Sequence, residues 1–515
     1  MGVRASVEGI AEHSPVSRAP RRQNALYPQP LHLGSSAATP NAQARLVPAM
    51  HRIPRWLFAA LSYAACSACG VESAPGPHAT EGAASGQSEP RPNVLFIVID
   101  TLRADRLGAY GHGRSTSPNL DALAAGGVRV PRALATAPWT TPSIAALMAS
   151  RDPTSLGIES EKARLADEAL LLAEVLRAAG YTTGAAVSHS FCSSTWGFDQ
   201  GFEGFDETNV QGHAALTTAG VTARGKSFLD EVAGQDAPWM LWLHYFDPHC
   251  AYVEDERFPF GGRGDYDGRV KSGELYRVIL REWRKYNAAD WNELERLYDS
   301  EIARTDAGIG ELLAHLDQLE LAEDTLVVVT ADHGEEFHDH GGVGHAKTLY
   351  SEVLHVPLIF RFPSAFPRFA NGQPPAPEHW VSLVDVAPTV LDVAGLEIPD
   401  DFFGKSLLGA EPRPVYASTH RAKGLRTIID GDLKLIHWVT PDRFALYNLA
   451  SDPAEEVDLV ASPDHAEDFA RLQAALAQHA ATVRRDAILA PSVDDQASDT
   501  EHLMDLGYSG VEDDE

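Results

Sequence analysis

The stretch PNVLFIVIDTLRADRLGAYG, from Pro92 to Gly111, decides the fold. Its first part, Val94 to Ile99, is an unbroken apolar run that ends in Asp100. A second such run, Leu326 to Val329, ends shortly before Asp332. Continuous apolar runs are typical of parallel strands that are buried on both faces. Because ligands bind beyond the carboxyl ends of strands in open α/β sheets, we expect both aspartates at the functional edge of one sheet.

Helical patterns lie between and around these strands. ADEALLLAEVLRAAG, from Ala166 to Gly180, ends in a glycine stop, and EIARTDAGIGELLAHLDQL, from Glu301 to Leu319, carries a helical apolar stripe. The order strand, helix, strand predicts an α/β fold with a doubly wound, mostly parallel sheet.

Composition sets limits on size and partners. With 515 residues and 44% hydrophobic content, the chain can bury a large core, and its length predicts more than one domain. The formal net charge of −30 argues against nucleic acid or an anionic lipid surface as the main partner. An anionic substrate therefore needs a local positive site, which a metal ion would supply.

The first part of the chain has the composition of an export signal. Residues 1–49 lack apolar periodicity, so we expect them to be disordered or a misassigned extension, with Met50 as the true start. Residues 50–69 have a basic start, a short apolar core and small residues, which is typical of a signal peptide. Cys66 and Cys69 allow lipid attachment, although neither has a leucine three positions before it. We expect an exported protein that is periplasmic, secreted or a membrane-tethered lipoprotein, with residues 70–92 as a flexible linker.

Most of the chain after this linker resembles the sulfatase family of the alkaline-phosphatase-like superfamily. The resemblance runs in the right order through five further segments, which are Ser117–Ser143, Leu326–Phe360, Val381–Gly395, Gly424–Trp438 and Ala445–Val460, and LMDLGY near the end is similar to a closing motif. The resemblance implies an alkaline-phosphatase-like catalytic domain over 93–410 and a smaller α+β subdomain over 411–490. Residues 491–515 are expected to form an acidic tail.

Four residues predict a metal site. Asp100, Asp332 and His333 follow two strands, Thr140 lies between them in sequence, and all four match ligand positions of the family. An isolated Asp-His pair more often caps a loop, but this placement favours a divalent cation. Thr101 stands where many sulfatases carry a second aspartate.

The donor set narrows the choice of ion. Calcium prefers about six to eight oxygen ligands, whereas imidazole suits zinc and carboxylate suits manganese. We expect one divalent ion, which is zinc or manganese in preference to calcium. A second ion is also compatible with the sequence.

Thr140 stands in APWTTPSIAALMAS where the family carries a cysteine or serine that becomes formylglycine. A formylglycine hydrate releases sulfate by collapsing to the aldehyde, but a threonyl ester must be cleared by attack at sulfur or phosphorus. Threonine here resembles the phosphoethanolamine transferases, lipoteichoic acid synthases and nucleotide pyrophosphatases. The alternative is that Thr140 is only a helix N-cap.

Three further residues are candidates through the resemblance. His345 stands where many sulfatases have a lysine that grips the ester, and it could bind substrate, protonate the leaving group or reach a second metal. Lys347 is an alternative for that grip, and His249 matches a histidine that contacts the ester. For His244, His338 and His340 we favour structural roles.

Two positions depart from the sulfatase pattern, with Ile144 in place of an arginine and Leu156 in place of a histidine. The absence of this arginine and this histidine fits the loss of formylglycine chemistry, but it is also compatible with a degenerate active site. Cys192 and Cys250 could form a disulfide in an oxidising compartment, or could be two unrelated buried residues.

These features predict a metal-dependent hydrolase of sulfuric or phosphoric esters that uses Thr140 as nucleophile and leans to phosphoryl chemistry. The substrate would be a small molecule or a glycan or lipid-headgroup ester. A phosphoethanolamine-type phosphotransferase is one alternative, and a catalytically silent binding protein of the same fold is another.

Overall fold

A computed structural model describes residues 90–210, 216–262 and 264–493 of the chain. The described residues all belong to one compact unit. The predicted extension (1–49) and signal peptide (50–69) lie outside the described residues, as do nearly all of the linker (70–92) and of the acidic tail (491–515).

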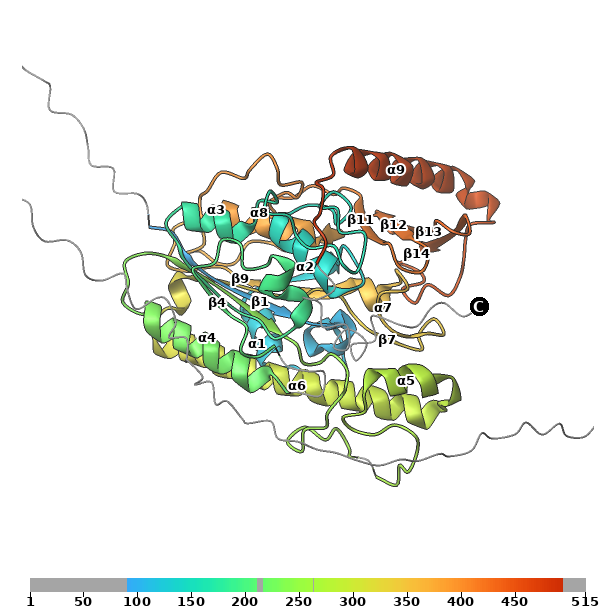
Figure 1. Ribbon diagram of the computed structural model, residues 1–515, viewed down its shortest axis with the longest axis horizontal. Coiled ribbons are helices and arrows are strands. Elements are labelled where there is room, and N and C mark those ends of the chain that lie inside the picture. Colours follow the sequence, from blue (N-terminus) through green and yellow to red (C-terminus); the bar gives the residue numbers. More distant parts are fainter. Residues whose placement is uncertain (1–89, 211–215, 263, 494–515) are drawn as a thin grey trace, which may run out of the picture. The chain divides into compact units, whose positions relative to one another are not determined.

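An eight-stranded sheet forms the centre of this unit, with the strand order β10-β2-β9-β6-β1-β5-β3-β4 (Figure 1). Its strands are β1 (Asn93–Ile99), β2 (Val128–Leu134), β3 (Thr182–Ala186), β4 (Gly204–Asp206), β5 (Trp239–Tyr245), β6 (Thr325–Ala331), β9 (His355–Arg361) and β10 (Val381–Ser382). Of these strands only β9 is antiparallel to its neighbours. The predicted α/β fold with a mostly parallel sheet is therefore confirmed.

The two apolar runs that predicted this sheet are its central strands. β1 pairs in parallel with β6, and Ile99 lies opposite Ala331 in that pairing. Every residue of β6 is buried, as is every residue of β1 except Asn93, because helices cover both faces of the sheet. Asp100 and Asp332 consequently leave the sheet side by side at its carboxyl edge.

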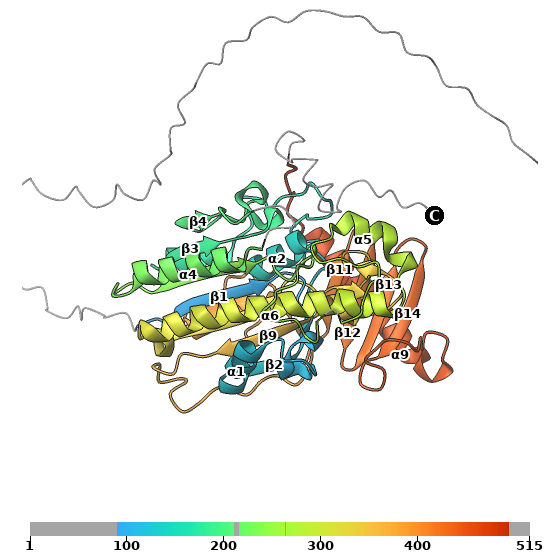
Figure 2. The ribbon, with the colours of Figure 1, turned by 90° about the horizontal axis from the view of Figure 1, so that it is seen from below.

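Helices form a layer on each face of the sheet (Figures 1 and 2). One layer contains α1 (Pro118–Gly126), α4 (Thr218–Val232) and α6 (Ala288–Gln318). The other contains α2 (Thr140–Ala149), α3 (Leu172–Ala178) and α8 (Val386–Val393). Two short helices, α5 (Tyr276–Glu282) and α7 (Ser351–Leu354), lie beyond the carboxyl edge of the sheet.

The two predicted helices exist, but their starts differ from the sequence pattern. α3 begins only at Leu172, because the Glu174 carboxylate accepts a hydrogen bond from the Leu171 backbone N–H at 2.9 Å and so fixes the first turn there. α6 begins earlier, at Ala288, where the Asn287 side chain accepts hydrogen bonds from two backbone N–H groups.

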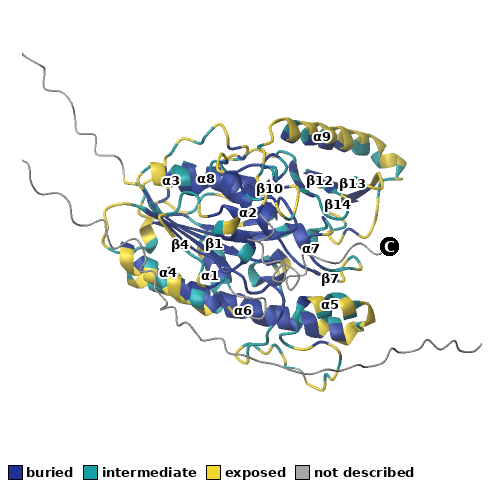
Figure 3. Cartoon of the chain, viewed as in Figure 1, coloured by how far each residue is buried: buried dark blue, intermediate teal, exposed yellow. Residues whose placement is uncertain are grey.

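A small C-terminal subdomain follows the main sheet, as predicted. Its antiparallel sheet contains β11 (Val415–Thr419), β12 (Leu425–Asp430), β13 (Leu433–Trp438) and β14 (Arg443–Asn448), and α9 (Ala466–Arg485) packs against one face. Figure 3 shows that α9 is buried only along the side that faces this sheet. The small core between them consists of Ile428, Leu435, Leu446, Leu472 and Leu476.

Within the described part of the chain, none of the helices combines the length and the apolar character that crossing a bilayer would require.

Candidate metal and ester site

Three buried ligand groups converge at the carboxyl edge of the sheet. Asp100 follows β1, and Asp332 and His333 follow β6, so the pairing of these two strands sets the spacing between them. One ligand atom from each residue lies within 4.8 Å of the others. This is the group that the sequence predicted as a metal site, and its chemistry suits a divalent cation.

The His333 ring is oriented with one nitrogen toward the carboxylates. Its Nε2 lies 3.6 Å from Asp100 Oδ1 and 3.4 Å from Asp332 Oδ2. Its Nδ1 lies 2.9 Å from the Gly334 carbonyl oxygen, which can accept a hydrogen bond only if Nδ1 carries the proton. The Nε2 lone pair is then available to a metal, an arrangement typical of histidine ligands.

Burial makes the carboxylates of this group costly in the absence of a cation. The side chains of Asp100, Asp332 and His333 have no solvent exposure. Neither Asp100 oxygen receives a hydrogen bond within the described residues, nor does Asp332 Oδ2. Burial, followed by the charges of Asp332 and Glu335, raises the pKa of Asp100 well above its usual range. A divalent cation would satisfy these oxygens, so the residues fit a metal site.

Thr101, which replaces the second aspartate of many sulfatases, contributes its backbone here. The Thr101 N–H lies 3.3 Å from Asp332 Oδ1, and its carbonyl oxygen accepts a 2.6 Å hydrogen bond from the Tyr298 hydroxyl. Its φ of 54° is in the left-handed region, which residues other than glycine rarely adopt. These contacts hold the start of the loop after β1 against Asp332.

Thr140 is the first residue of α2 and faces the metal group. Its Oγ1 lies 3.4 Å from His333 Nε2. The N-cap of α2 is Trp139, so the alternative that Thr140 serves only as the N-cap is wrong. Ser143, one turn further on, donates a 2.5 Å hydrogen bond to the Asp332 carbonyl oxygen and thereby fixes α2 against the loop after β6.

His345 is held beside this group by a buried carboxylate. Its Nδ1 lies 2.9 Å from Glu335 Oε1, and the other Glu335 oxygen accepts a 3.0 Å hydrogen bond from the Tyr252 hydroxyl. The His345 ring centroid lies 4.6 Å from that of His333. Burial raises the pKa of Glu335 to about 7. We predicted no role for Glu335 from the sequence, although its position directly after the Asp-His-Gly segment could have indicated one.

His249 and Lys347, the predicted substrate-binding residues, lie in different surroundings. His249 is buried, and its ring centroid is 5.0 Å from that of His345. Lys347 is exposed. The structure therefore brings His249 into the cluster of histidines, while a role for Lys347 in binding the ester stays a prediction.

Two more histidines approach Asp100. His189 Nδ1 lies 3.3 Å and His244 Nε2 lies 3.7 Å from Asp100 Oδ2. Burial, with a contribution from His333, lowers the pKa of His244 to about 3, so its imidazole is neutral. Sequence reasoning missed His189, although it follows β3 at the same edge of the sheet.

His338 and His340 have structural surroundings, as predicted. The His338 ring is parallel to that of Trp291 at 5.0 Å between centroids. His340 stacks on Tyr350 at 3.6 Å, and its Nδ1 lies 2.8 Å from Glu352 Oε1.

Cys192 and Cys250 are both buried and are not joined by a disulfide. Burial raises the pKa of both thiols well above the usual range. Of the two alternatives, the structure shows two separate buried residues.

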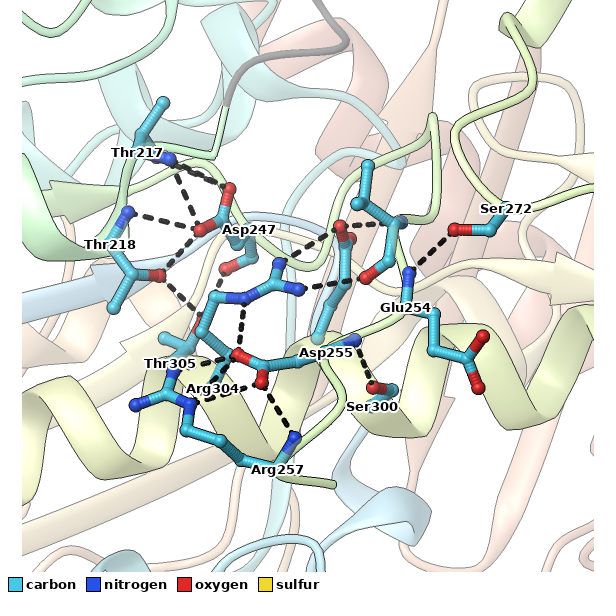
Figure 4. Close-up of polar contacts among 12 residues, drawn as sticks. Thr217, Thr218, Asp247, Glu254, Asp255, Arg257, Ser272, Ser300, Arg304 and Thr305 are labelled. Carbon is cyan, nitrogen blue, oxygen red and sulfur yellow. Dashed lines mark hydrogen bonds and ion pairs between the residues drawn. The ribbon is translucent and has the colours of Figure 1, made fainter. Parts of the chain in front are cut away.

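Asp247, close to His249 in sequence, belongs to a separate network (Figure 4). Its carboxylate accepts hydrogen bonds from the Thr218 N–H at 3.0 Å and the Thr218 hydroxyl at 2.5 Å, and also from Thr217. Thr305 on α6 donates to the Asp247 carbonyl oxygen at 3.1 Å. These contacts fix the start of α4 and the loop that carries His249.

The two departures from the sulfatase pattern are packed in the core. Ile144 and Leu156 have no solvent exposure, so apolar contacts fill the positions where the family carries an arginine and a histidine.

Residues 92–396 match the family model described as "Sulfatase". The chain belongs to the sulfatase family. It is 26% identical over 346 residues to an ulvan-active sulfatase of Formosa agariphila, and the match covers 62% of this chain and 65% of that protein.

Solved structures share the fold. One, determined in complex with its substrate D-glucosamine-2-N,6-O-disulfate, has a TM-score of 0.64 at 21% identity and covers 77% of this chain and 98% of that one. The phosphonate monoester hydrolase of Agrobacterium radiobacter has a TM-score of 0.59 at 21% identity and covers 77% of this chain and 96% of that one.

Proposed function

We propose that this sulfatase-family protein is a metal-dependent ester hydrolase in which Thr140 is the nucleophile, acting on phosphoric esters in preference to sulfuric esters. The observation that carries the proposal is the 3.4 Å separation between Thr140 Oγ1 and His333 Nε2, beside carboxylate oxygens that receive no hydrogen bond from the part of the chain that the structure describes. A hydroxyl in that place can attack an ester whose oxygens contact the same cation.

Asp100, Asp332, His333 and Thr140 would hold the ion. We propose zinc or manganese ahead of calcium, because one of the four ligands is an imidazole and only two are carboxylates. A divalent cation there would stabilise negative charge on Thr140 Oγ1 and on the oxygens of the ester.

The reaction would proceed in two displacements at phosphorus. Thr140 Oγ1 gives up its proton and forms a bond to phosphorus while the bond to the leaving oxygen breaks, and the departing alcohol takes up a proton in turn. Water then attacks phosphorus, releases phosphate and restores the Thr140 hydroxyl. In the second step water must attack phosphorus directly. A threonyl ester, in contrast to a formylglycine hydrate, cannot release its phosphate by collapsing to an aldehyde.

His345 is the candidate proton carrier for both displacements. Glu335 holds its Nδ1 at 2.9 Å, so Nε2 is the nitrogen that would give a proton to the leaving alcohol and take one from the attacking water. His249, whose ring lies 5.0 Å from that of His345, would contact the ester oxygens.

The names of relatives suggest the organic half of the substrate. The ulvan-active sulfatase and the neighbour solved with a disulfated glucosamine both concern sulfated carbohydrates, which favours a glycan ester over a lipid headgroup. A phosphotransferase would use the same Thr140 chemistry with an acceptor alcohol in place of water. A silent binding protein is disfavoured by the retention of Asp100, Thr140, Asp332 and His333 in one buried group.

Replacing Thr140 tests the proposal. Thr140→Ala should lower turnover of an aryl phosphate by about 10³-fold or more, because the covalent route is lost. Thr140→Ser keeps the hydroxyl and should retain part of the activity. With a slowly hydrolysed phosphate monoester, peptide mass spectrometry should find a phosphoryl adduct on the peptide that contains Thr140.

The outcome also decides between phosphorus and sulfur. Full activity in Thr140→Ala would exclude the covalent route. Much faster turnover of an aryl sulfate than of any phosphate ester would exclude the preference for phosphorus, and water-attack sulfate hydrolysis would then replace it.

We also propose that the protein is exported, on the basis of the basic, apolar and small-residue pattern of residues 50–69. Fractionation of the producing cell should find a protein that begins near Cys66 or Cys69, outside the cytoplasm. An intact Met1 on a cytoplasmic protein would contradict the proposal.

A further inference from the structure

A cavity lies between the first turn of α2 and the C-terminal subdomain. Its volume is about 280 Å³. It is lined by Trp139 and Pro142, on either side of Thr140 in sequence, and by residues of the connection between β11 and β12. Pockets for small molecules start at about 300 Å³, so this cavity suits a single sugar-sized unit.

The lining is basic, which contrasts with the acidic chain. Lys423, Arg426 and Arg484 contribute cationic groups, and Glu159 is the carboxylate that opposes them. Glu159 Oε1 lies 3.7 Å from Arg484 Nη2. Burial, followed by the charge of Arg484, lowers the pKa of Arg426, while the charges of Glu159 and Asp152 act in the opposite direction.

The connection between β11 and β12 is docked on the residue before the nucleophile. The His420 ring meets the Trp139 ring edge-on at 5.5 Å, and the Arg421 guanidinium carbon lies 4.7 Å from the Trp139 ring centroid. Arg421 also forms a 3.0 Å ion pair with Glu161 of the main domain. These contacts fix the basic wall relative to Thr140.

The backbone of this connection is strained at two positions. Ala422 and Lys423 have φ values of 49° and 63°, in the left-handed region that glycine favours. Such strain persists where the surrounding packing over-determines the conformation. Here it turns Lys423 toward the cavity that it lines.

We propose that this cavity binds the organic half of the ester and takes a sugar-sized unit that carries its own carboxylate or sulfate, held by Arg426, Arg484 and Lys423. The proposal rests on the proposed function, because it assumes that Thr140 marks the position of the scissile ester. It adds that the substrate carries a second anionic group besides that ester.

Binding to the full-length Thr140→Ala protein tests the subsite without turnover. The probes are a sulfated disaccharide with a uronic acid and the same disaccharide after carboxyl reduction and desulfation, titrated by calorimetry. The anionic probe should bind about ten-fold or more tightly than the neutral one, since one lost charge-assisted contact corresponds to roughly a decade of affinity.

Variants that each remove one positive charge then locate the binding site. Arg426→Gln, Arg484→Gln and Lys423→Gln should each weaken binding of the anionic probe by about five- to ten-fold and leave the neutral probe unaffected. Lys423 is exposed at the turn, so this variant remains informative if Arg426→Gln does not fold. Arg485→Gln is the matched control, because Arg485 neighbours Arg484 on α9 but does not line the cavity.

Equal binding of the two probes, or an equal loss in Arg485→Gln, would overturn the subsite. Failure of the proposed function is seen separately, as unchanged ester turnover in Thr140→Ala, and does not affect these titrations.

Discussion

Asp100 and Asp247 lie near the carboxyl ends of neighbouring strands, but their carboxylates are stabilised in different ways. Both are buried, with exposed fractions of 0% and 2%. Asp247 accepts hydrogen bonds from the backbone and hydroxyl groups of Thr217 and Thr218, whereas neither oxygen of Asp100 receives one within the described residues. A buried carboxylate needs donors, a proton or a cation. Asp247 has hydrogen-bond donors, so Asp100 is the residue whose charge requires a cation.

The neighbours of each carboxylate explain the difference. The start of α4 points its backbone N–H groups at Asp247, and such groups have no partner inside the helix. Asp100 is surrounded instead by Asp332, His189, His244 and His333, which are metal-ligand types. The first arrangement holds a loop in place, and the second is able to hold an ion.

The largest expected effect is a difference in metal content between variants of Asp100 and variants of Asp247. Asp100→Asn and Asp332→Asn should lose bound metal and lower kcat/KM by about 10³-fold or more, because a ligand charge disappears from the site. Asp247→Asn should keep its metal. Elemental analysis and ester turnover on the same preparations measure both quantities. Metal content equal to wild type in Asp332→Asn would contradict the ligand assignment.

Much of the contrast between Asp100 and Asp247 could be predicted from the sequence, and the rest depends on tertiary contacts. Apolar runs that end in Asp100 and just before Asp332 placed both residues at one sheet edge, because strand pairing brings such ends together. No sequence pattern shows that Asp247 meets Thr217 and Thr218, since those donors belong to a helix that packs on α6. His189 was missed for the same reason, as a lone histidine after a short strand gives no signal until β3 is placed beside β5.

The second prediction concerns the pH dependence of stability in the metal-free protein. Burial raises the pKa of Asp100 and raises that of Glu335 to about 7, so the folded state binds these protons more tightly than the unfolded state. The contribution of these two groups to stability should therefore be greatest below pH 4 to 5 and decrease as pH rises toward 7, with about 3 kcal/mol lost through Glu335 alone. Denaturant unfolding of chelator-treated protein across this range measures the slope.

Metal supplies the control for this pH series. With the cation bound, the carboxylates of the site are ionised in the folded state, so the decline between pH 5 and 7 should disappear or reverse. A Glu335→Gln variant with the same pH dependence of stability as the unmodified metal-free protein would show that Glu335 is not kept protonated by burial.

The third prediction tests the hydrogen-bonded aspartate. Asp247→Asn removes one acceptor position from a charged group that accepts several hydrogen bonds, and should lower the free energy of unfolding by about 1.5 to 3 kcal/mol. The loss should be the same with and without metal, because Asp247 does not belong to the metal group. Paired urea titrations measure it. A loss confined to the metal-bound protein would place Asp247 in the cation site.

The smallest expected effect comes from the edge of the Asp247 network. Thr305 Oγ1 donates to the Asp247 carbonyl oxygen at 3.1 Å and lies 3.2 Å from Thr218 Oγ1. Thr305→Val keeps the shape of the side chain but removes this donor, so the free energy of unfolding should fall by about 1 kcal/mol, the typical net value of one hydrogen bond. Thr305→Ser is the matched control, because it keeps the hydroxyl and loses only a methyl group. If the valine variant also loses metal or activity, the two networks are coupled through the loop that carries His249, and the carboxylates of Asp100 and Asp247 are not independent.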